Sequence, residues 1–220
     1  MKQNQDYKNE SLAALKGNWA PAVLAGIAVY TIFCVLMGPY YGVSIASAFS
    51  DVTAHAIIPL YVGTLVLIYL VGWPLTVGYY NAQKVLLVNG DNRLIQNMFE
   101  IGFGNWLHYV WGSFLMMLYI ALWTLLLFIP GIIKSYSYAM TYYILVERPE
   151  LSANQAIDES RRLMIGHKFD LFYLDLSFIG WILLSMLTCG IGLLWVMPYW
   201  VTARAAFWED IKANDPAWQA

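Results

Sequence analysis

Six long apolar runs constrain the fold of this 220-residue chain more than any other feature. A helix needs about 20 mostly apolar residues to cross a lipid bilayer. The runs are Ala20–Met37, Ala56–Tyr80, Leu107–Ile129, Gly131–Glu147, Leu171–Thr188 and Ile191–Trp208. We therefore predict an all-α fold, a polytopic bundle of about six transmembrane helices.

The composition supports a membrane location. Hydrophobic residues make up 60% of the chain and charged residues 12%, against roughly 45–50% and 25% in soluble proteins. A soluble domain of this size has too small a core to bury that much apolar surface, so the surplus is expected to face lipid. The net charge of −2 gives no general attraction to nucleic acid. The lipid bilayer is the partner that the composition predicts.

Short breaks between the runs predict how they connect. Pro130 and Gly131 separate the third run from the fourth, and the segment 189–192 (CGIG) separates the fifth from the sixth. Both are typical of tight helix–helix turns, which predicts helical hairpins. Gly72, Trp73 and Pro74 are expected to kink the second run; two shorter helices are the alternative there.

The basic residues predict the orientation, because they gather on the cytoplasmic side of membrane proteins. With the N-terminus inside, eleven of them lie on that side: Lys2, Lys8, Lys16, Lys84, Arg93, Arg148, Arg161, Arg162, Lys168, Arg204 and Lys212. Only Lys134 lies near the outer face, and the expected external loop Gly38–His55 has no basic residue. We expect Lys84 and Lys134 to extend to the headgroups. The prediction is a multi-pass protein of the bacterial cytoplasmic membrane with both termini in the cytoplasm.

Three similar stretches suggest loose repeats within one membrane domain of residues 1–220. They are residues 11–19 (SLAALKGNW), 97–106 (NMFEIGFGNW) and 160–169 (SRRLMIGHKF). In each, an amphipathic stretch is followed by a glycine and an aromatic residue before an apolar run. We interpret each as a cytoplasmic interfacial helix, a turn at Gly17, Gly104 or Gly166, and a hairpin. The repeats would span residues 1–90, 91–150 and 151–210.

The third amphipathic helix has the clearest signals. Ser152 and Gln155 fit a capping box, and Pro149 ends the preceding helix. One face of the predicted helix then holds Ala153, Ala156, Ile157, Ser160, Leu163 and Met164. The basic cluster Arg161, Arg162 and Lys168 is a candidate cytoplasmic contact surface for a soluble partner or anionic lipid. Simple packing at the membrane surface is the alternative.

Two charges inside the runs are candidates for a site, because charge is costly in lipid. Asp175 and Arg204 lie at similar distances from the turn at 189–192, so we predict an ion pair across the hairpin. Independent extension to the headgroups and a proton or substrate relay remain alternatives. Cys34 and Cys189 are expected to be buried packing residues.

The sequence contains no recognisable catalytic motif. The three histidines lack metal-ligand spacing, and neither a P-loop nor a G-x-S-x-G motif is present. We therefore expect no catalytic residue, metal or cofactor.

Several segments resemble one known family. They are residues 15–19 (LKGNW), 129–140 (IPGIIKSYSYAM), 160–168 (SRRLMIGHK), 176–181 (LSFIGW) and 188–199 (TCGIGLLWVMPY). Together they resemble the bacterial integral-membrane family catalogued as domain of unknown function 975, most densely from Asn105 to Asp210. The resemblance implies a multi-span membrane protein and no particular activity.

Two functions remain open. The first is a non-enzymatic membrane organiser or accessory protein that binds another membrane or cytoplasmic protein. The alternative is a transporter, pore or lipid-handling protein, which needs a polar cavity between helices. Hydroxyl side chains that would line one are Thr124, Ser135, Ser137, Thr141, Ser177 and Ser185.

Overall fold

The computed structural model describes residues 1–47 and 54–218, and every regular element in those ranges is helical. The elements are α1 (Asn4–Leu15), α2 (Trp19–Ala46), α3 (Ala54–Leu67), the π-helical turn η1 (Ile68–Gly72), α4 (Trp73–Asn89), α5 (Leu94–Gly104), α6 (Trp106–Leu126), α7 (Phe128–Ser137), α8 (Thr141–Glu147), α9 (Ala153–Leu163), α10 (Lys168–Leu176), α11 (Ile179–Leu187), α12 (Leu193–Ala213) and the short 3-10 helix η2 (Pro216–Trp218). This confirms the predicted all-α class.

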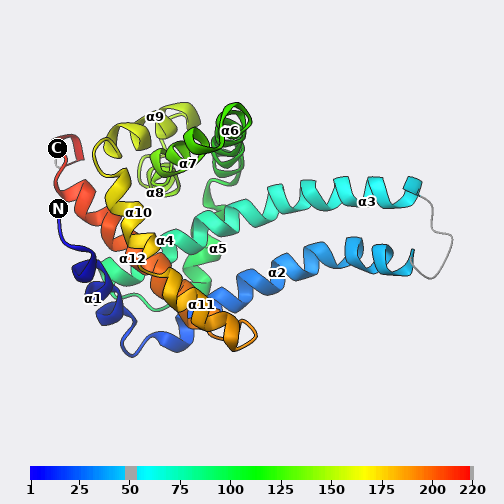
Figure 1. Ribbon diagram of the computed structural model, residues 1–220, viewed down its shortest axis with the longest axis horizontal. Coiled ribbons are helices and arrows are strands. Elements are labelled where there is room, and N and C mark those ends of the chain that lie inside the picture. The colour runs from blue at the N-terminus through cyan, green and yellow to red at the C-terminus, as the bar shows by residue number, and fades with distance from the viewer. Residues whose placement is uncertain (48–53, 219–220) are drawn as a thin grey trace.

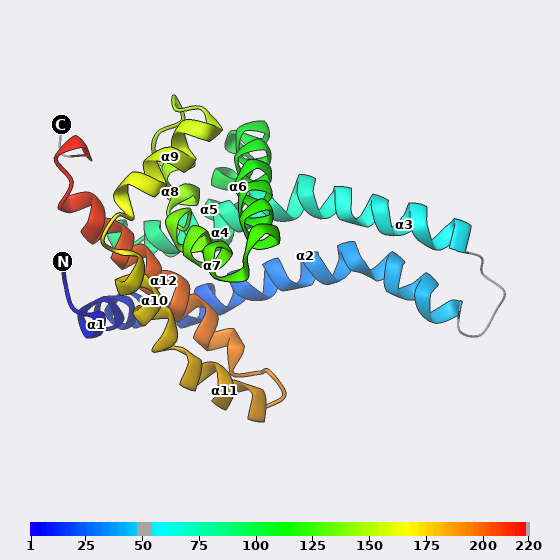
Figure 2. The same cartoon turned by 45° about the horizontal axis from the view of Figure 1, so that its top comes forward.

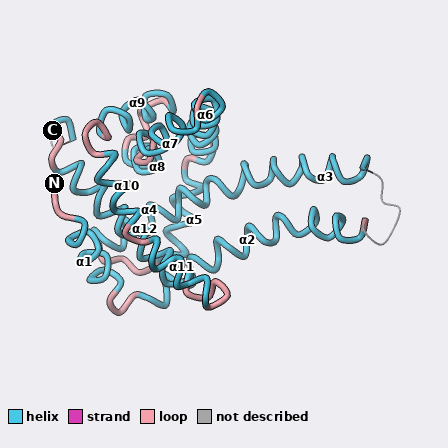
Figure 3. Tube along the Cα trace, in the orientation of Figure 1, coloured by secondary structure: helices cyan, strands magenta, loops and turns pink. Residues whose placement is uncertain are grey.

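The helices divide into a projecting hairpin and a compact body (Figures 1 and 2). Helices α2 and α3 run antiparallel, side by side, and extend far from the remaining helices. Short connections join most of the other helices, so that α6 with α7 and α11 with α12 also fold back on one another (Figure 3). The body lies at the end of α2 and α4 that is opposite to the hairpin tip.

We call the base the part of the body formed by α1, α8, α9, η2 and the last turns of α4 and α12. Its interior is aromatic: the rings of Tyr143 and Trp208 stack with centroids 5.6 Å apart, and those of Tyr7 and Phe207 meet edge to face at 5.3 Å. All four side chains are buried. Burial of such large rings contributes strongly to stability, so these contacts hold the base together.

Four helical segments are long and apolar enough to cross a membrane: Trp19–Ala46, Ile57–Asn89, Trp106–Leu126 and Lys168–Leu187. Their outer surfaces are apolar; Leu125 is 83% exposed and Leu187 81%. Surfaces of this kind and length are typical of helices solvated by lipid. The expected fourth run is divided between α7 and α8, and α12 carries Arg204 within its length.

Both cysteines differ from expectation. Cys34 and Cys189 are exposed rather than buried, because the apolar runs that hold them face outward. The segment Gly38–Gly42, expected to be a loop, lies within α2, which continues through Pro39. The rest of the expected external loop includes residues 48–53, which lie outside the described residues.

The second run forms one continuous helical segment rather than two helices, with the π-helical turn η1 next to Pro74. Proline has no N–H, so the carbonyl of Leu70, four residues earlier, loses its α-helical donor. The indole Nε1 of Trp106 donates to this oxygen at 2.5 Å. The kink predicted from Pro74 is thus a π-helical turn supported by a side chain from α6.

Two glycines allow α4 and α5 to pack with their backbones in contact. A Cβ atom on Gly78 would overlap the carbonyl oxygen of Met98, and one on Gly102 would lie 2.6 Å from the oxygen of Pro74. Only glycine therefore fits these positions without a shift of a helix. This close contact fixes the position of α5 against α4 and places the start of α6 beside η1.

Helix α9 shows the features that its sequence predicts. Ser152 and Gln155 form both bonds of the capping box, and α8 ends at Glu147 before Pro149. All six residues of the expected apolar face are buried. They pack against α6, α7 and α8, so this face is covered by protein.

A side chain of α9 forms hydrogen bonds with backbone groups at the break between α7 and α8. The Ser160 hydroxyl donates to the carbonyl of Ser137 at 3.0 Å and accepts from the amide of Met140 at 3.2 Å. Interrupted helices are tolerated at membrane depth where the freed backbone groups find such partners. Ser160 therefore replaces part of the hydrogen bonding that the break removes.

Candidate functional site: a charged cavity at the broken helices

A cavity of about 250 Å³ lies where α7, α8, α10 and α12 meet. Its lining combines one guanidinium, one carboxylate, several phenol rings and apolar side chains: Tyr80, Met116, Ile120, Ser135, Tyr136, Tyr138, Ala139, Tyr142, Asp175 and Arg204. Both residues of the predicted ion pair are among them.

The structure brings Asp175 and Arg204 together. Arg204 Nη2 lies 3.5 Å from Asp175 Oδ2, and the two side chains are only 14% and 17% exposed. Trp200, one turn before Arg204 on α12, donates its indole N–H to Asp175 Oδ1 at 2.7 Å. The guanidinium lies over the Trp200 ring, 4.9 Å from its centroid. Trp200 therefore holds the carboxylate and stacks against the cation.

The cavity lies beside both interruptions in the surrounding helices. Tyr138 and Ala139 occupy the α7–α8 break, and Asp175 lies just before the break between α10 and α11. At this second break the ammonium group of Lys8 donates a hydrogen bond to the carbonyl oxygen of Ser177 at 3.3 Å. Burial lowers the pKa of Lys8. Discontinuous helices of this kind surround binding sites in many membrane transporters.

An apolar groove of about 670 Å³ adjoins the cavity between α2, α4 and α12. It shares Tyr80 with the cavity, and Trp200, which bonds Asp175, forms part of its wall. The groove then follows α12 through Met197 and Leu194 to the turn at Ile191. A charged end and an apolar extension are thus contiguous.

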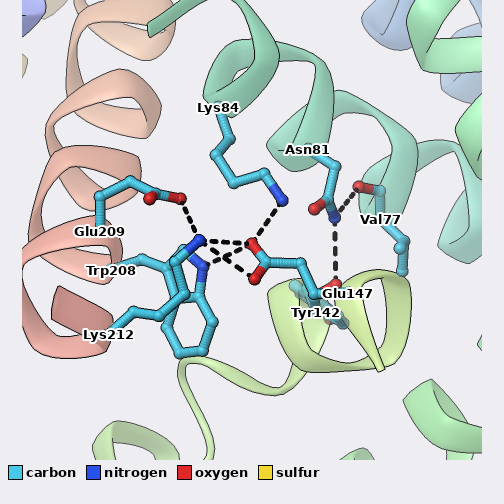
Figure 4. A network of polar contacts seen from close by, with 8 residues as sticks. All are labelled: Val77, Asn81, Lys84, Tyr142, Glu147, Trp208, Glu209 and Lys212. Atoms are coloured by element: carbon cyan, nitrogen blue, oxygen red, sulfur yellow. Dashed lines mark hydrogen bonds and ion pairs between the residues drawn. The ribbon is translucent and has the colours of Figure 1, made fainter. Parts of the chain in front are cut away.

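A second group of charges ties the base together (Figure 4). Glu147 accepts hydrogen bonds from Lys84 at 2.7 Å, from Lys212 at 3.1 Å and from the indole of Trp208 at 2.9 Å. Glu209 also bonds Lys212, at 2.9 Å. Lys84 is 9% exposed, so it is buried in this network and does not extend to the headgroups. The reason is Glu147, which offers it a partner inside the protein.

Sequence reasoning missed this network. Lys84 and Glu147 lie on different helices, 63 residues apart, and neither position carries a motif. The only available signal was a glutamate at the end of an apolar run, with a lysine at a similar depth in another.

The base also joins the two ends of the chain. Asp210 accepts from the backbone N–H of Lys2 at 2.9 Å and from the phenol of Tyr7 at 2.7 Å. Burial raises the pKa of Asp210, but these hydrogen bonds more than offset that effect and leave the pKa below its ordinary value. Burial and the bond to Asp210 raise the pKa of Tyr7.

The predicted contact surface on α9 is partly used within the chain. Arg162 bonds Glu159 at 2.8 Å and Asp215 at 2.7 Å, which ties α9 to the C-terminal segment. Its hydrogen bonds lower the pKa of both carboxyl groups. Arg161 forms an exposed ion pair with Asp158 at 3.2 Å, and Lys168 is half-buried at the start of α10. Arg161 and Arg162 both remain exposed, and the ion pair of Arg161 is with a residue of α9 itself.

Most of the hydroxyl groups that were predicted to line a cavity form hydrogen bonds with the backbone of their own segment. Thr124, Ser135, Ser137, Ser177 and Ser185 each donate to a carbonyl three or four residues earlier. Of the hydroxyls named from the sequence, Ser135 alone lines the charged cavity. Lys134 lies over the ring of Trp123, 4.5 Å from its centroid.

These features define a helical protein with four apolar helices suited to crossing a membrane and a charged cavity at interrupted helices. Residues 110–215 match the model of the family described as Protein of unknown function (DUF975). The match confirms the resemblance seen in the sequence, over slightly less than half of the 220 residues. Comparison with curated proteins and with solved structures gave no match.

Proposed function

We propose that this chain is a non-enzymatic membrane protein that organises or assists a partner through its base. The observation that carries the proposal is the use of its charges: Glu147 and Asp210 accept hydrogen bonds from neighbouring helices, and we expect these links to make the base rigid. A rigid surface binds with little loss of conformational freedom. The exposed side of α9, with Asp158 and Arg161, would be its contact surface.

The proposed topology has about six crossings, with both ends in the cytoplasm of a bacterial cell. Two observations support it. The bond between Lys2 and Asp210 keeps the chain ends together, which suits an even number of crossings. The divided segment α7–α8 and helix α12 would add two crossings to the four apolar segments. Reporter tags at the two ends test it; opposite locations would contradict it.

Site-directed photocrosslinking in native membranes tests the partner proposal. A photoreactive residue at Arg161 should give one protein adduct of defined mass, and the variant Asp158→Lys should weaken it. A photoreactive residue at Leu125, on the apolar surface of α6, is the control and should react with lipid. Lipid adducts alone from both positions would rule out the base as a contact surface.

A second candidate function, the handling of a small molecule or lipid, is favoured by the charged cavity. Cavities at broken helices are typical of transporters, and this one holds the pair Asp175 and Arg204. Vesicles with the reconstituted protein test it through the movement of fluorescent lipids between leaflets. Acceleration that is lost in Arg204→Gln supports handling of lipid; a rate equal to that of empty vesicles contradicts it.

A further inference from the structure

We propose that the charged cavity and the apolar groove bind one membrane amphiphile whose headgroup carries both an anionic group and an ammonium group. A phosphoethanolamine headgroup has this chemistry. The inference rests on the second candidate function and names its ligand class. The headgroup occupies the cavity at Asp175 and Arg204, and an acyl chain follows the groove along α12.

The anionic group is assigned to Arg204. Its contact with Asp175, at 3.5 Å, is longer than the roughly 2.7–2.9 Å of a charge-assisted hydrogen bond. Its Nε atom is buried with no acceptor among the described residues. A guanidinium carries several N–H donors, and burying them without acceptors is costly. A phosphate oxygen in the cavity would supply the missing acceptor.

The ammonium group is assigned to Asp175 and the aromatic wall. The indole of Trp200 donates to Oδ1 of this carboxylate, whereas the contact of Oδ2 with Arg204 is long, at 3.5 Å. Tyr80 and Tyr142 line the same cavity with their ring centroids 5.7 Å apart. Carboxylates and tyrosine faces both attract ammonium ions. The cavity therefore presents complementary charges to the two ends of a zwitterion.

The groove argues for an amphiphile over a free zwitterion. The cavity alone, at about 250 Å³, is smaller than the roughly 300–1,000 Å³ of pockets that hold drug-sized ligands. The adjoining groove, at about 670 Å³, is lined mainly by apolar residues such as Phe33, Leu194 and Met197. Arg204 and Leu194 are separated by about 15 Å along α12 at the usual helical rise. This distance accommodates much of an acyl chain.

Native mass spectrometry of the detergent-purified protein tests the proposal. Phosphatidylethanolamine, phosphatidylglycerol and diacylglycerol are compared at equal concentration. We expect phosphatidylethanolamine adducts to exceed the others by at least about fivefold, equivalent to about 1 kcal/mol. Asp175→Asn should remove the preference over phosphatidylglycerol, since only the ammonium needs the carboxylate. Arg204→Gln should weaken the binding of both phospholipids. Lys134→Gln should change neither, because that side chain packs on Trp123 and does not line the cavity.

A groove variant keeps the test independent of the ion pair. Met197→Trp should fill the groove and reduce phosphatidylethanolamine adducts while both charges remain. Equal retention of the three lipids, or an unchanged preference in Asp175→Asn, would overturn the zwitterion assignment but leave lipid handling intact. No specific adduct with any lipid would overturn both. Soluble phosphoethanolamine that raises the Tm as strongly as the lipid would assign the cavity to a free zwitterion and overturn the amphiphile.

Discussion

The indole of Trp106 donates a hydrogen bond to the main-chain oxygen of Leu70, the carbonyl that Pro74 leaves without its α-helical donor. Trp106 begins α6, and Leu70 lies in the π-helical turn before α4. A proline-induced defect in one apolar helix is thus supported by the first residue of another.

Removal of this bond should weaken the packing of the two helices. We expect Trp106→Phe to lower the free energy of unfolding by about 1 kcal/mol, the usual value of one such hydrogen bond. Pro74→Ala restores an N–H for Leu70, so the double variant should lose less than Trp106→Phe measured alone. Reversible unfolding in detergent measures all three. If Trp106→Phe lowered the free energy of unfolding equally in the wild type and in Pro74→Ala, the Trp106 indole would not be compensating for the proline.

Ser160→Ala should destabilise the protein by about 1–3 kcal/mol, because it leaves the Ser137 carbonyl and the Met140 amide unbonded in a buried place. Both bonds come from α9 and bridge the α7–α8 break. Ser135→Ala is the matched control, since that hydroxyl bonds only its own helix. The comparison uses the midpoint of thermal unfolding. A loss no larger than that of Ser135→Ala would show that the break needs no support from α9.

Glu147→Gln should cost on the order of 2 kcal/mol, because it removes the carboxylate that bonds the buried Lys84 and leaves Lys212 with Glu209 alone of its two carboxylates. The control is Glu10→Gln, which breaks the exposed pair of Lys2 and Glu10 at 2.6 Å. Exposed pairs contribute roughly 0–1 kcal/mol. Chemical denaturation of both variants provides the test, and similar losses would argue against a central role for Glu147.

The Arg162 cluster predicts sensitivity to acid. Hydrogen bonds from Arg162 hold the pKa of Glu159 and of Asp215 below their ordinary values. Their contribution to stability is therefore complete above about pH 4, near the pKa values of the unfolded chain. It is lost as the pH falls through the lower values of the folded state. In Arg162→Gln, the gap in Tm from the wild type should narrow on acidification; a constant gap would be inconsistent with this linkage.

Gly78→Ala should be among the most damaging single methyl additions, because its Cβ would overlap the backbone of α5 at Met98. We expect a loss of about 2–3 kcal/mol, within the range of overpacking. Gly104→Ala is the control, since a Cβ there has open space. Thermal unfolding distinguishes them, and equal behaviour would mean that α4 and α5 separate easily.

Local sequence signals predicted local structure well. The capping box at Ser152 and the buried face of α9 follow from residues a few positions apart, and the turns at Gly17 and Gly166 have the positive φ that favours glycine. Gly104, expected to form the third turn, instead ends α5. The prediction that Cys34 and Cys189 are buried was wrong. Apolar residues are usually buried in soluble proteins, but on a helix that faces lipid they lie on the outer surface.

Contacts between distant segments were harder to predict. The pairing of Asp175 with Arg204 was expected because a single hairpin places both at similar depth. The bonds of Lys84 with Glu147 and of Ser160 with Ser137 depend on how separate hairpins pack. Periodicity contains no information on that packing. The charged cavity depends on the same packing. The sequence alone therefore indicated only Asp175 and Arg204 among the residues that carry its charge.

The bond between Lys2 and Asp210 has a consequence for biosynthesis. These residues leave the ribosome at nearly opposite times, so the first helix is made long before its main partner exists. Until α12 emerges, Tyr7 lacks both Asp210, which accepts its hydrogen bond, and Phe207, which packs against its ring. Closure of the base is therefore a late step of assembly, and a chain that stalls before residue 210 lacks the bonds that join α1 to Asp210.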